Sequence, residues 1–160
     1  MGIAGDDRPT VPAGLSQEEP GPQLSEKAII GWREWIALPE LGVSALKVKV
    51  DTGAKTSALH AVGLKKVYRR GLTWLRFHVP GGDDDALESA ETECRLLDYR
   101  EIRSSSGHLE RRPLIATPIL LNGQLWIIDL TLTNRDEMGF RMLLGRDAIH
   151  QRFCVDPGRS

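Results

Sequence analysis

Short stretches in which apolar and polar residues alternate follow one another from Ile29 onward, and they indicate a mainly β chain. Along 46–50, leucine and valine alternate with lysine, which is typical of a strand with one buried and one exposed face, and this strand ends at Asp51. The segment 75–79 alternates in the same way. Gly, Pro and Asn separate such stretches at short intervals, so we predict strands joined by turns and little helix.

A hairpin and a single short helix complete the predicted elements. The segment 118–132 contains the pair Asn122-Gly123, whose tolerance of positive φ suits a tight hairpin turn. The second arm, 126–132, is almost continuously apolar, and we expect it to be buried on both faces. The one predicted helix covers about 146–152. The loop at 81–91 contains three consecutive aspartates and is expected to be exposed.

The chain has 160 residues, which is the common size of a single domain. Its first part, 1–28, is rich in Gly and Pro and shows no hydrophobic period, so we predict a flexible N-terminal tail followed by one domain over 29–160.

Composition narrows the classes of function. The net charge of −1 argues against nucleic acid as the main partner. No apolar run reaches the length of a membrane-spanning helix, so we expect no membrane partner and a cytoplasmic location. Cys94 and Cys154 are too few for a disulfide framework and are expected to be reduced.

The candidate chemistry begins at the end of the first predicted strand, with Asp51-Thr52-Gly53. A hydrophobic strand delivers a carboxylate into a turn, and a hydroxyl and a glycine that permits close backbone approach follow it. As a bare tripeptide this would be an ordinary turn. About ninety residues later the apolar segment 142–144 leads into Gly145-Arg146. This second motif favours a functional role for Asp51-Thr52-Gly53 over an ordinary turn.

These two motifs, in this order in a small β-rich chain, resemble the retropepsin-like aspartic proteases. The resemblance is closer to a bacterial branch of that family, which has been named ATP-dependent zinc protease and is associated with RimK-type ligases. It extends from about residue 30 to 156 and rests on five segments: GWREW at 31–35, VDTGAKTSALHA at 50–61, RPLI at 112–115, LTNRD at 132–136 and MLLGR at 142–146.

The resemblance implies an all-β fold, a closed β-barrel with one short C-terminal helix. It also implies an aspartic endopeptidase that acts as a homodimer, because this chain contains one Asp-Thr-Gly and the mechanism needs two carboxylates. Asp51 of each subunit would activate the water, while Thr52 and Gly53 would hold the loop. The candidate substrate-binding residues are Ala54, Lys55, Thr56 and Arg146, together with a flap at Ser105, Ser106 and Gly107.

Lys55 departs from the viral members of the family, which carry an acid at this position. Two cations, Lys55 and Arg146, would then lie near the substrate channel unless Asp147 neutralises one, and they would favour acidic side chains. The further basic residues 65–66, 69–70 and 111–112 would extend this preference if they face the cleft, and otherwise they are solvated strand ends. A protease for polyglutamate tails, such as a glutamylated ribosomal protein made by a RimK-type ligase, fits this preference.

Two other classes stay open. A zinc hydrolase needs about three nitrogen, oxygen or sulfur ligands, and neither an HExxH motif nor a close ligand pair is present, so we predict no metal. The chain lacks a Gly-rich phosphate loop, and we predict no cofactor. The other alternative is a non-catalytic module of the same fold that binds glutamylated tails.

Overall fold

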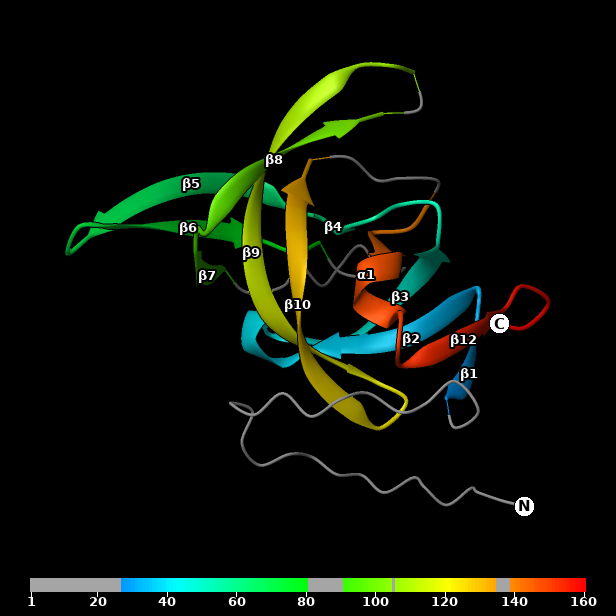
Figure 1. The fold of residues 1–160 in the computed structure, drawn as a ribbon. Coiled ribbons are helices and arrows are strands. Elements are labelled where there is room, and N and C mark those ends of the chain that lie inside the picture. Colours follow the sequence, from blue (N-terminus) through cyan, green and yellow to red (C-terminus); the bar gives the residue numbers. More distant parts are fainter. Residues whose placement is uncertain (1–26, 81–90, 105, 135–138) are drawn as a thin grey trace.

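The computed structural model describes residues 27–80, 91–104, 106–134 and 139–160. Within them it consists of strands, one 3-10 helix and one short α-helix (Figure 1). In chain order these are β1 (Ala28–Gly31), β2 (Arg33–Leu38), η3 (Pro39–Leu41), β3 (Val43–Asp51), β4 (Ser57–His60), β5 (Val62–Arg69), β6 (Leu72–His78), β7 (Thr92–Arg95), β8 (Asp98–Arg103), β9 (Leu109–Leu121), β10 (Gln124–Thr133), β11 (Met142–Gly145), α1 (Arg146–Ile149) and β12 (Phe153–Asp156). The mainly β prediction is confirmed. The predicted tail at 1–28 and loop at 81–91 lie almost entirely outside the described residues.

Six strands form a closed hydrogen-bonded ring in the order β10-β4-β11-β3-β2-β9, because β9 also pairs with β10. The pairs β10–β4 and β11–β3 are parallel, and the other pairs are antiparallel. β8 adds to the outside of β9 and extends the sheet beyond the ring.

The hydrophobic core takes side chains from every strand of the ring. Fully buried examples are Leu38, Val48, Leu59, Ile115, Leu130 and Leu144. The alternation that predicted a strand at 46–51 is confirmed by β3, whose apolar side chains at 46, 48 and 50 all face this core. Burial of about twenty-five apolar side chains in one cluster explains why the chain needs no disulfide for a core.

The predicted hairpin is confirmed by β9 and β10. Asn122 has φ 53° and Gly123 has φ 78°, the two positive angles that a two-residue turn of this type requires. The expectation that its second arm is buried on both faces is wrong for the first half. Ile127 is 55% exposed, because the core lies on one side of the ring and the outer side of this half remains in contact with solvent.

The predicted helix is present but shorter than expected. α1 ends at Ile149, and Gln151 adopts φ 74°, a left-handed conformation that breaks the helical path before β12. None of the described helices has the length and apolarity needed to cross a membrane.

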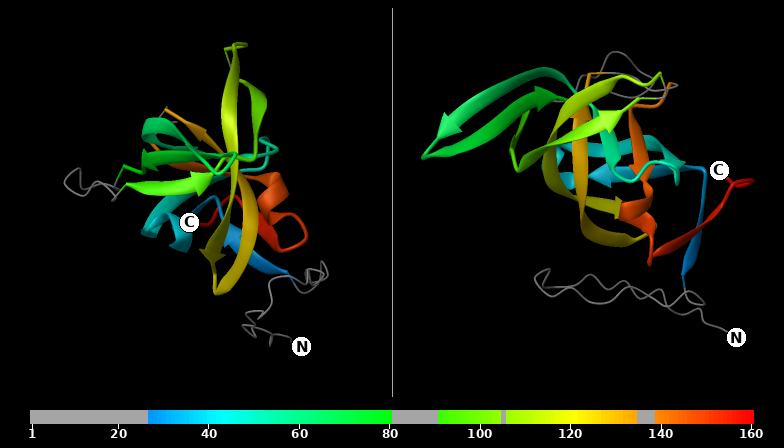
Figure 2. Two further views of the ribbon diagram at one scale, coloured as in Figure 1. Left: turned by 90° about the vertical axis from the view of Figure 1, so that its left-hand side faces the viewer. Right: turned by 45° about the horizontal axis from the view of Figure 1, so that its top comes forward.

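Two smaller sheets flank the ring on opposite sides (Figures 1 and 2). The strands β5, β6 and β7 form an antiparallel sheet that projects away from the ring, and we call it the arm. Leu75 and Phe77 of β6 are buried and anchor it to the core, which confirms the strand predicted at 75–79. On the other side β1 pairs in parallel with β12.

Candidate active site

Asp51 is the last residue of a strand that is paired on both edges. β3 pairs with β2 on one side and with β11 on the other, and Gly145 lies opposite Asp51 in the parallel β11–β3 ladder. The β11 ladder reaches Asp51 itself, whereas the β2 ladder ends at Lys49, with one further backbone bond from the Val50 N–H to the Trp32 carbonyl. The residues that follow, Thr52 and Gly53, are exposed, whereas Asp51 itself is half-buried.

A tight turn orients the Asp51 carboxylate. The backbone N–H of Gly53 donates to Asp51 Oδ1 at 3.0 Å, and the N–H of Ala54 donates to the Asp51 carbonyl at 3.2 Å. A carboxylate that accepts a backbone hydrogen bond two residues ahead is held in one orientation. The structure therefore presents one oriented, half-buried carboxylate beside the exposed residues Thr52 and Gly53.

The segment 145–147 crosses the loop 54–57 and locks it in place. Three backbone N–H groups of the segment donate to that loop: Gly145 to Ser57 Oγ at 3.0 Å, Arg146 to the Ala54 carbonyl at 2.8 Å, and Asp147 to the Lys55 carbonyl at 3.1 Å. The crossing is close. A β-carbon added at Gly145 would lie 2.7 Å from the Thr56 carbonyl carbon, so glycine is required here for steric reasons.

The side chain of Arg146 supports the same loop. Its Nη1 donates to the carbonyl oxygens of Thr52 at 3.4 Å and of Gly53 at 3.3 Å. Among the described residues, Arg146 makes no salt bridge with Asp147, and Lys55 makes none either. The two candidate cations are therefore not neutralised by Asp147, but the guanidinium of Arg146 is engaged with the backbone of the loop.

A polar cavity of about 470 Å³ adjoins the loop beside α1. Lys55 and Thr56, two of the predicted substrate-binding residues, lie in its wall, as does Arg100 of β8. Sequence reasoning missed Arg100. No local pattern pointed to it, because its place beside the loop depends on the β8–β9 register, in which Arg100 lies opposite Arg112.

The β8–β9 hairpin carries the predicted flap tip. The Gly107 N–H donates to the Ser104 carbonyl at 2.9 Å, and the Oγ atoms of Ser104 and Ser106 lie 2.9 Å apart. Gly107 has φ 89°, so glycine is favoured at this corner of the turn. Ser105 lies outside the described residues. The hairpin extends beyond the ring (Figure 2), and its role as a flap stays a prediction.

An ion pair between a buried arginine and a partly buried glutamate of β9 connects this hairpin to β10. Arg112, only 5% exposed, donates from Nη2 to Glu110 Oε2 at 3.1 Å, and Thr133 Oγ1 of β10 donates to Glu110 Oε1 at 3.2 Å. Arg111 points to the other face, where its guanidinium carbon lies 4.2 Å from the centre of the Tyr99 ring. Arg112 is thus a buried structural residue.

The remaining nucleophilic and metal-ligating side chains form no second centre in the part of the chain that the structure describes. No group of three or more His, Cys, Asp or Glu side chains there is arranged to hold a metal ion. Cys94 and Cys154 are free thiols. Burial raises the pKa of the Cys94 thiol, which keeps it protonated and poorly nucleophilic.

Comparisons with known proteins agree with this geometry. Residues 29–160 match the family model described as RimB-like, retropepsin-like aspartic endopeptidase RimB. The chain is 46% identical over 134 residues to a probable alpha-L-glutamate ligase of Shewanella halifaxensis, covering 84% of this chain and 29% of the ligase. It is 47% identical over 131 residues to a protein of the same name from Desulfotalea psychrophila, covering 82% and 28%. The chain therefore spans less than a third of the length of these curated relatives.

A solved structure has the same fold. The crystal structure of the protein Lpg0085 with unknown function (DUF785) from Legionella pneumophila superposes with a TM-score of 0.70 at 32% identity, covering 82% of this chain and 94% of that one. The overall fold of this chain is therefore similar to one that has been observed by experiment.

Proposed function

This chain belongs to the RimB-like family of retropepsin-like aspartic endopeptidases, and we propose that it hydrolyses peptide bonds as a homodimer with one Asp51 from each subunit. The observation that carries the proposal is the single Asp-Thr-Gly turn, rigidly held from behind by Gly145 and Arg146 and exposed in front at Thr52 and Gly53. A turn of this kind supplies half of a two-carboxylate site, and two-fold symmetry supplies the other half.

Two facing carboxylates explain the chemistry. Like charges so close together cannot both ionise, so the pair shares one proton and titrates as a unit. The ionised Asp51 takes a proton from water, and the hydroxide formed attacks the amide carbonyl carbon. The protonated Asp51 donates to the carbonyl oxygen. The tetrahedral intermediate then collapses, its C–N bond breaks, and the amine leaves with a proton from the pair.

We further propose that the ring of six strands is the closed barrel of this family, and that the β8–β9 hairpin is its flap. The closure through the β9–β10 pairing supports the barrel, and the position of the hairpin, in which β8 follows β7 and β9 continues into the ring, supports the flap.

An acidic peptide is the substrate class that the site favours. Three cations, Lys55, Arg100 and Arg152, and two acids, Asp129 and Asp147, line the cavity beside the Asp51 loop, and none of the five forms a salt bridge with a described residue, so the wall has a small excess of positive charge. The relatives join a domain like this one to a probable alpha-L-glutamate ligase in one chain. We propose that this protein acts on polyglutamate tails, such as those of a glutamylated ribosomal protein, and that it works alongside a RimK-type ligase.

Cleavage of a peptide library that contains oligoglutamate tails, read by mass spectrometry from pH 4 to 8 with and without chelator, tests the proposal. Asp51→Asn should abolish cleavage and leave the fold unchanged, because an asparagine oxygen still accepts the Gly53 N–H. Asp156→Asn is a matched control, since Asp156 Oδ1 accepts the Gly158 N–H at 2.9 Å in a turn of the same kind. Cleavage that survives in Asp51→Asn would contradict the aspartic mechanism, and cleavage that chelator removes would indicate a metal hydrolase.

The dimer is tested in the same samples by analytical ultracentrifugation. Activity per subunit should rise with protein concentration in parallel with the dimer fraction, because a monomer has one carboxylate. Tight binding of oligoglutamate without cleavage under any condition would favour the non-catalytic binding module.

A further inference from the structure

We propose that the arm is an exosite that binds an extended acidic peptide along the free edge of β5, away from Asp51. This inference rests on the proposed function for its choice of an acidic peptide partner. It adds a second binding site to that function, which would hold the part of a long substrate that lies outside the catalytic cleft.

The first two strands of the arm are basic, although the segment 62–95 as a whole carries six bases and six acids. Residues 62–80, which contain β5 and β6, hold five Lys and Arg residues and no acid, whereas residues 81–95 hold one Arg and six acids. Glu93 is bound by Arg69 and Arg76, and Glu91 forms a second salt bridge with Arg76, so these two acids balance the charge of the two arginines. The other four, which form no salt bridge with a described residue, are Lys65, Lys66, Arg70 and Arg95.

β5 is an edge strand with an exposed surface on both faces. In the three-stranded sheet its only described neighbour is β6, and all of its residues are exposed or half-exposed. Its open N–H and C=O groups are a template for an added strand. Extended peptides bind sheet edges in this way through main-chain hydrogen bonds.

The cations of β5 favour a peptide whose consecutive residues are acidic. Successive side chains of a strand point to opposite faces, so Lys65 and Arg69 lie on one face of the arm and Lys66 and Tyr68 on the other. A strand paired with β5 alternates in the same way. Neighbouring carboxylates would therefore meet a lysine on each face. A phosphate backbone would not use the main-chain hydrogen bonds of the edge, which is why we infer a peptide.

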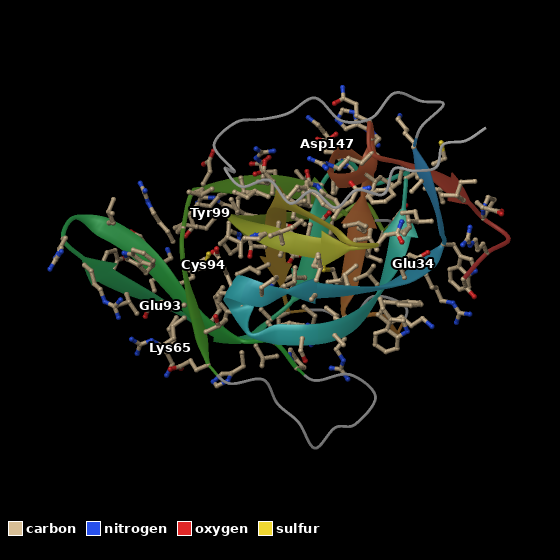
Figure 3. All side chains as sticks on the ribbon, turned by 90° about the horizontal axis from the view of Figure 1, so that it is seen from below. Glu34, Lys65, Glu93, Cys94, Tyr99 and Asp147 are labelled. Carbon is tan, nitrogen blue, oxygen red and sulfur yellow. The ribbon has the colours of Figure 1, made fainter. Side chains whose placement is uncertain are left out.

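Lys66 is held in place where the arm meets the hairpin. Its Nζ lies 5.3 Å from the centre of the Tyr99 ring, and the Arg111 guanidinium carbon lies 4.2 Å from the same ring. Figure 3 shows Lys65 and Glu93 on the arm and Tyr99 at its junction with the ring. Two cations ordered on one aromatic ring lose less side-chain entropy on binding a carboxylate than two free side chains would.

The binding test uses the full chain with Asp51→Asn, so that the peptide stays intact, and a fluorescein-labelled octaglutamate read by fluorescence anisotropy. Adding K65A/K66A should weaken binding about five- to tenfold, because two exposed ion pairs are lost. The control K27A/K47A removes the same charge elsewhere and should leave binding within about twofold. Both lysines of β5 are exposed, and the thermal midpoint of each variant confirms that it is folded.

Two further probes distinguish strand addition from general attraction between charges. An octaglutamate that is N-methylated at every residue keeps its carboxylates and loses its main-chain donors, so it should not bind. An eight-residue oligothymidylate should bind more weakly than octaglutamate. The exosite proposal is wrong if either probe binds as tightly as octaglutamate, or if K27A/K47A weakens octaglutamate binding as much as K65A/K66A does.

The exosite and the proposed function can fail separately. If K65A/K66A binds octaglutamate as tightly as the parent while the wild-type protein cleaves it, the exosite is wrong and the peptidase stands. If the arm variant loses binding and the wild-type protein never cleaves, the exosite stands and the peptidase is wrong. If both hold, K65A/K66A should raise the KM for long acidic peptides and leave the kcat for short ones unchanged.

Discussion

The substitution Gly145→Ala tests whether the crossing behind Asp51 has the close geometry that the structure shows. The added β-carbon would lie 2.7 Å from the Thr56 carbonyl carbon and 2.9 Å from the carbonyl oxygens of Lys55 and Thr56. All three are backbone atoms, so they cannot rotate away as a side chain would. The φ angle of Gly145 is −83°, which alanine adopts freely, so the cost is steric and does not come from backbone strain.

The expected loss of stability follows from these contacts. Forcing an extra carbon into a packed site costs about 1–3 kcal/mol. Separation of the two segments also lengthens the hydrogen bond from Gly145 N to Ser57 Oγ, which contributes about 0.5–1.5 kcal/mol. Alanine returns about 0.4–1 kcal/mol because it restricts the unfolded chain. The net expectation is a decrease of about 2 kcal/mol in the free energy of unfolding.

Equilibrium unfolding in urea, followed by tryptophan fluorescence at one fixed protein concentration, measures this change. The concentration is fixed because the midpoint of a dimer depends on it. Gly158→Ala is the matched control: its β-carbon would meet only Asp156 Oδ1, at an ordinary 3.5 Å, and it should leave stability unchanged or slightly raised. Equal unfolding free energies for the two variants would refute the crossing. Catalysis by Gly145→Ala should also fall, since the Asp51 loop is displaced.

Three further outcomes follow from single interactions. Arg146→Ala removes two hydrogen bonds to loop carbonyls and should lower kcat more than it raises KM, and the opposite kinetic result would indicate substrate binding. Trp126→Phe removes the buried bond from Nε1 to a carbonyl of α1 and should cost about 1–3 kcal/mol in urea unfolding, whereas Trp35→Phe, 60% exposed, should cost less than about 0.5 kcal/mol. Burial alone would raise the pKa of Glu93, but hydrogen bonds from two arginines outweigh it and hold that pKa below its ordinary 4.5. The arm should therefore keep this stabilisation above about pH 4.5 and lose it as the pH falls through the lowered value. Amide exchange of the arm should accelerate over this pH range in the wild-type protein and should show no such change in Glu93→Gln.

Local patterns in the sequence determined the elements on which the site is built. The alternation along 46–50 predicted a half-buried strand that ends at Asp51, and the Asn122-Gly123 pair predicted the hairpin between β9 and β10. Both signals act within a few residues, through side-chain burial and through backbone angles that few residues adopt. The Asp-Thr-Gly and apolar-Gly-Arg segments, with three further segments, resemble the retropepsin-like family, and the comparisons confirm that the chain belongs to it.

The environment of those elements was decided by contacts between distant parts of the chain. Gly145 bonds to Ser57 across 88 positions, and Arg146 reaches the carbonyl of Thr52 across 94. The sequence motif identified Arg146 but could not show whether it faces the substrate or the loop. Arg111 and Arg112 are neighbours in sequence, yet one stacks on Tyr99 and the other is buried.

The physical reason is that alternation shows which residues share a face but not what covers that face. Apolar runs alone could not distinguish the half of β10 that faces solvent at Ile127 from the half that is buried beside β4. In the same way, the sequence left open whether the basic residues of β5 face the cleft or are solvated strand ends, and the sheet order places them on an edge strand of the arm. The sequence by itself determined the strands, the turns and the Asp-Thr-Gly motif, and the closure of the ring decided which of their surfaces form the core, which adjoin the candidate site and which face solvent.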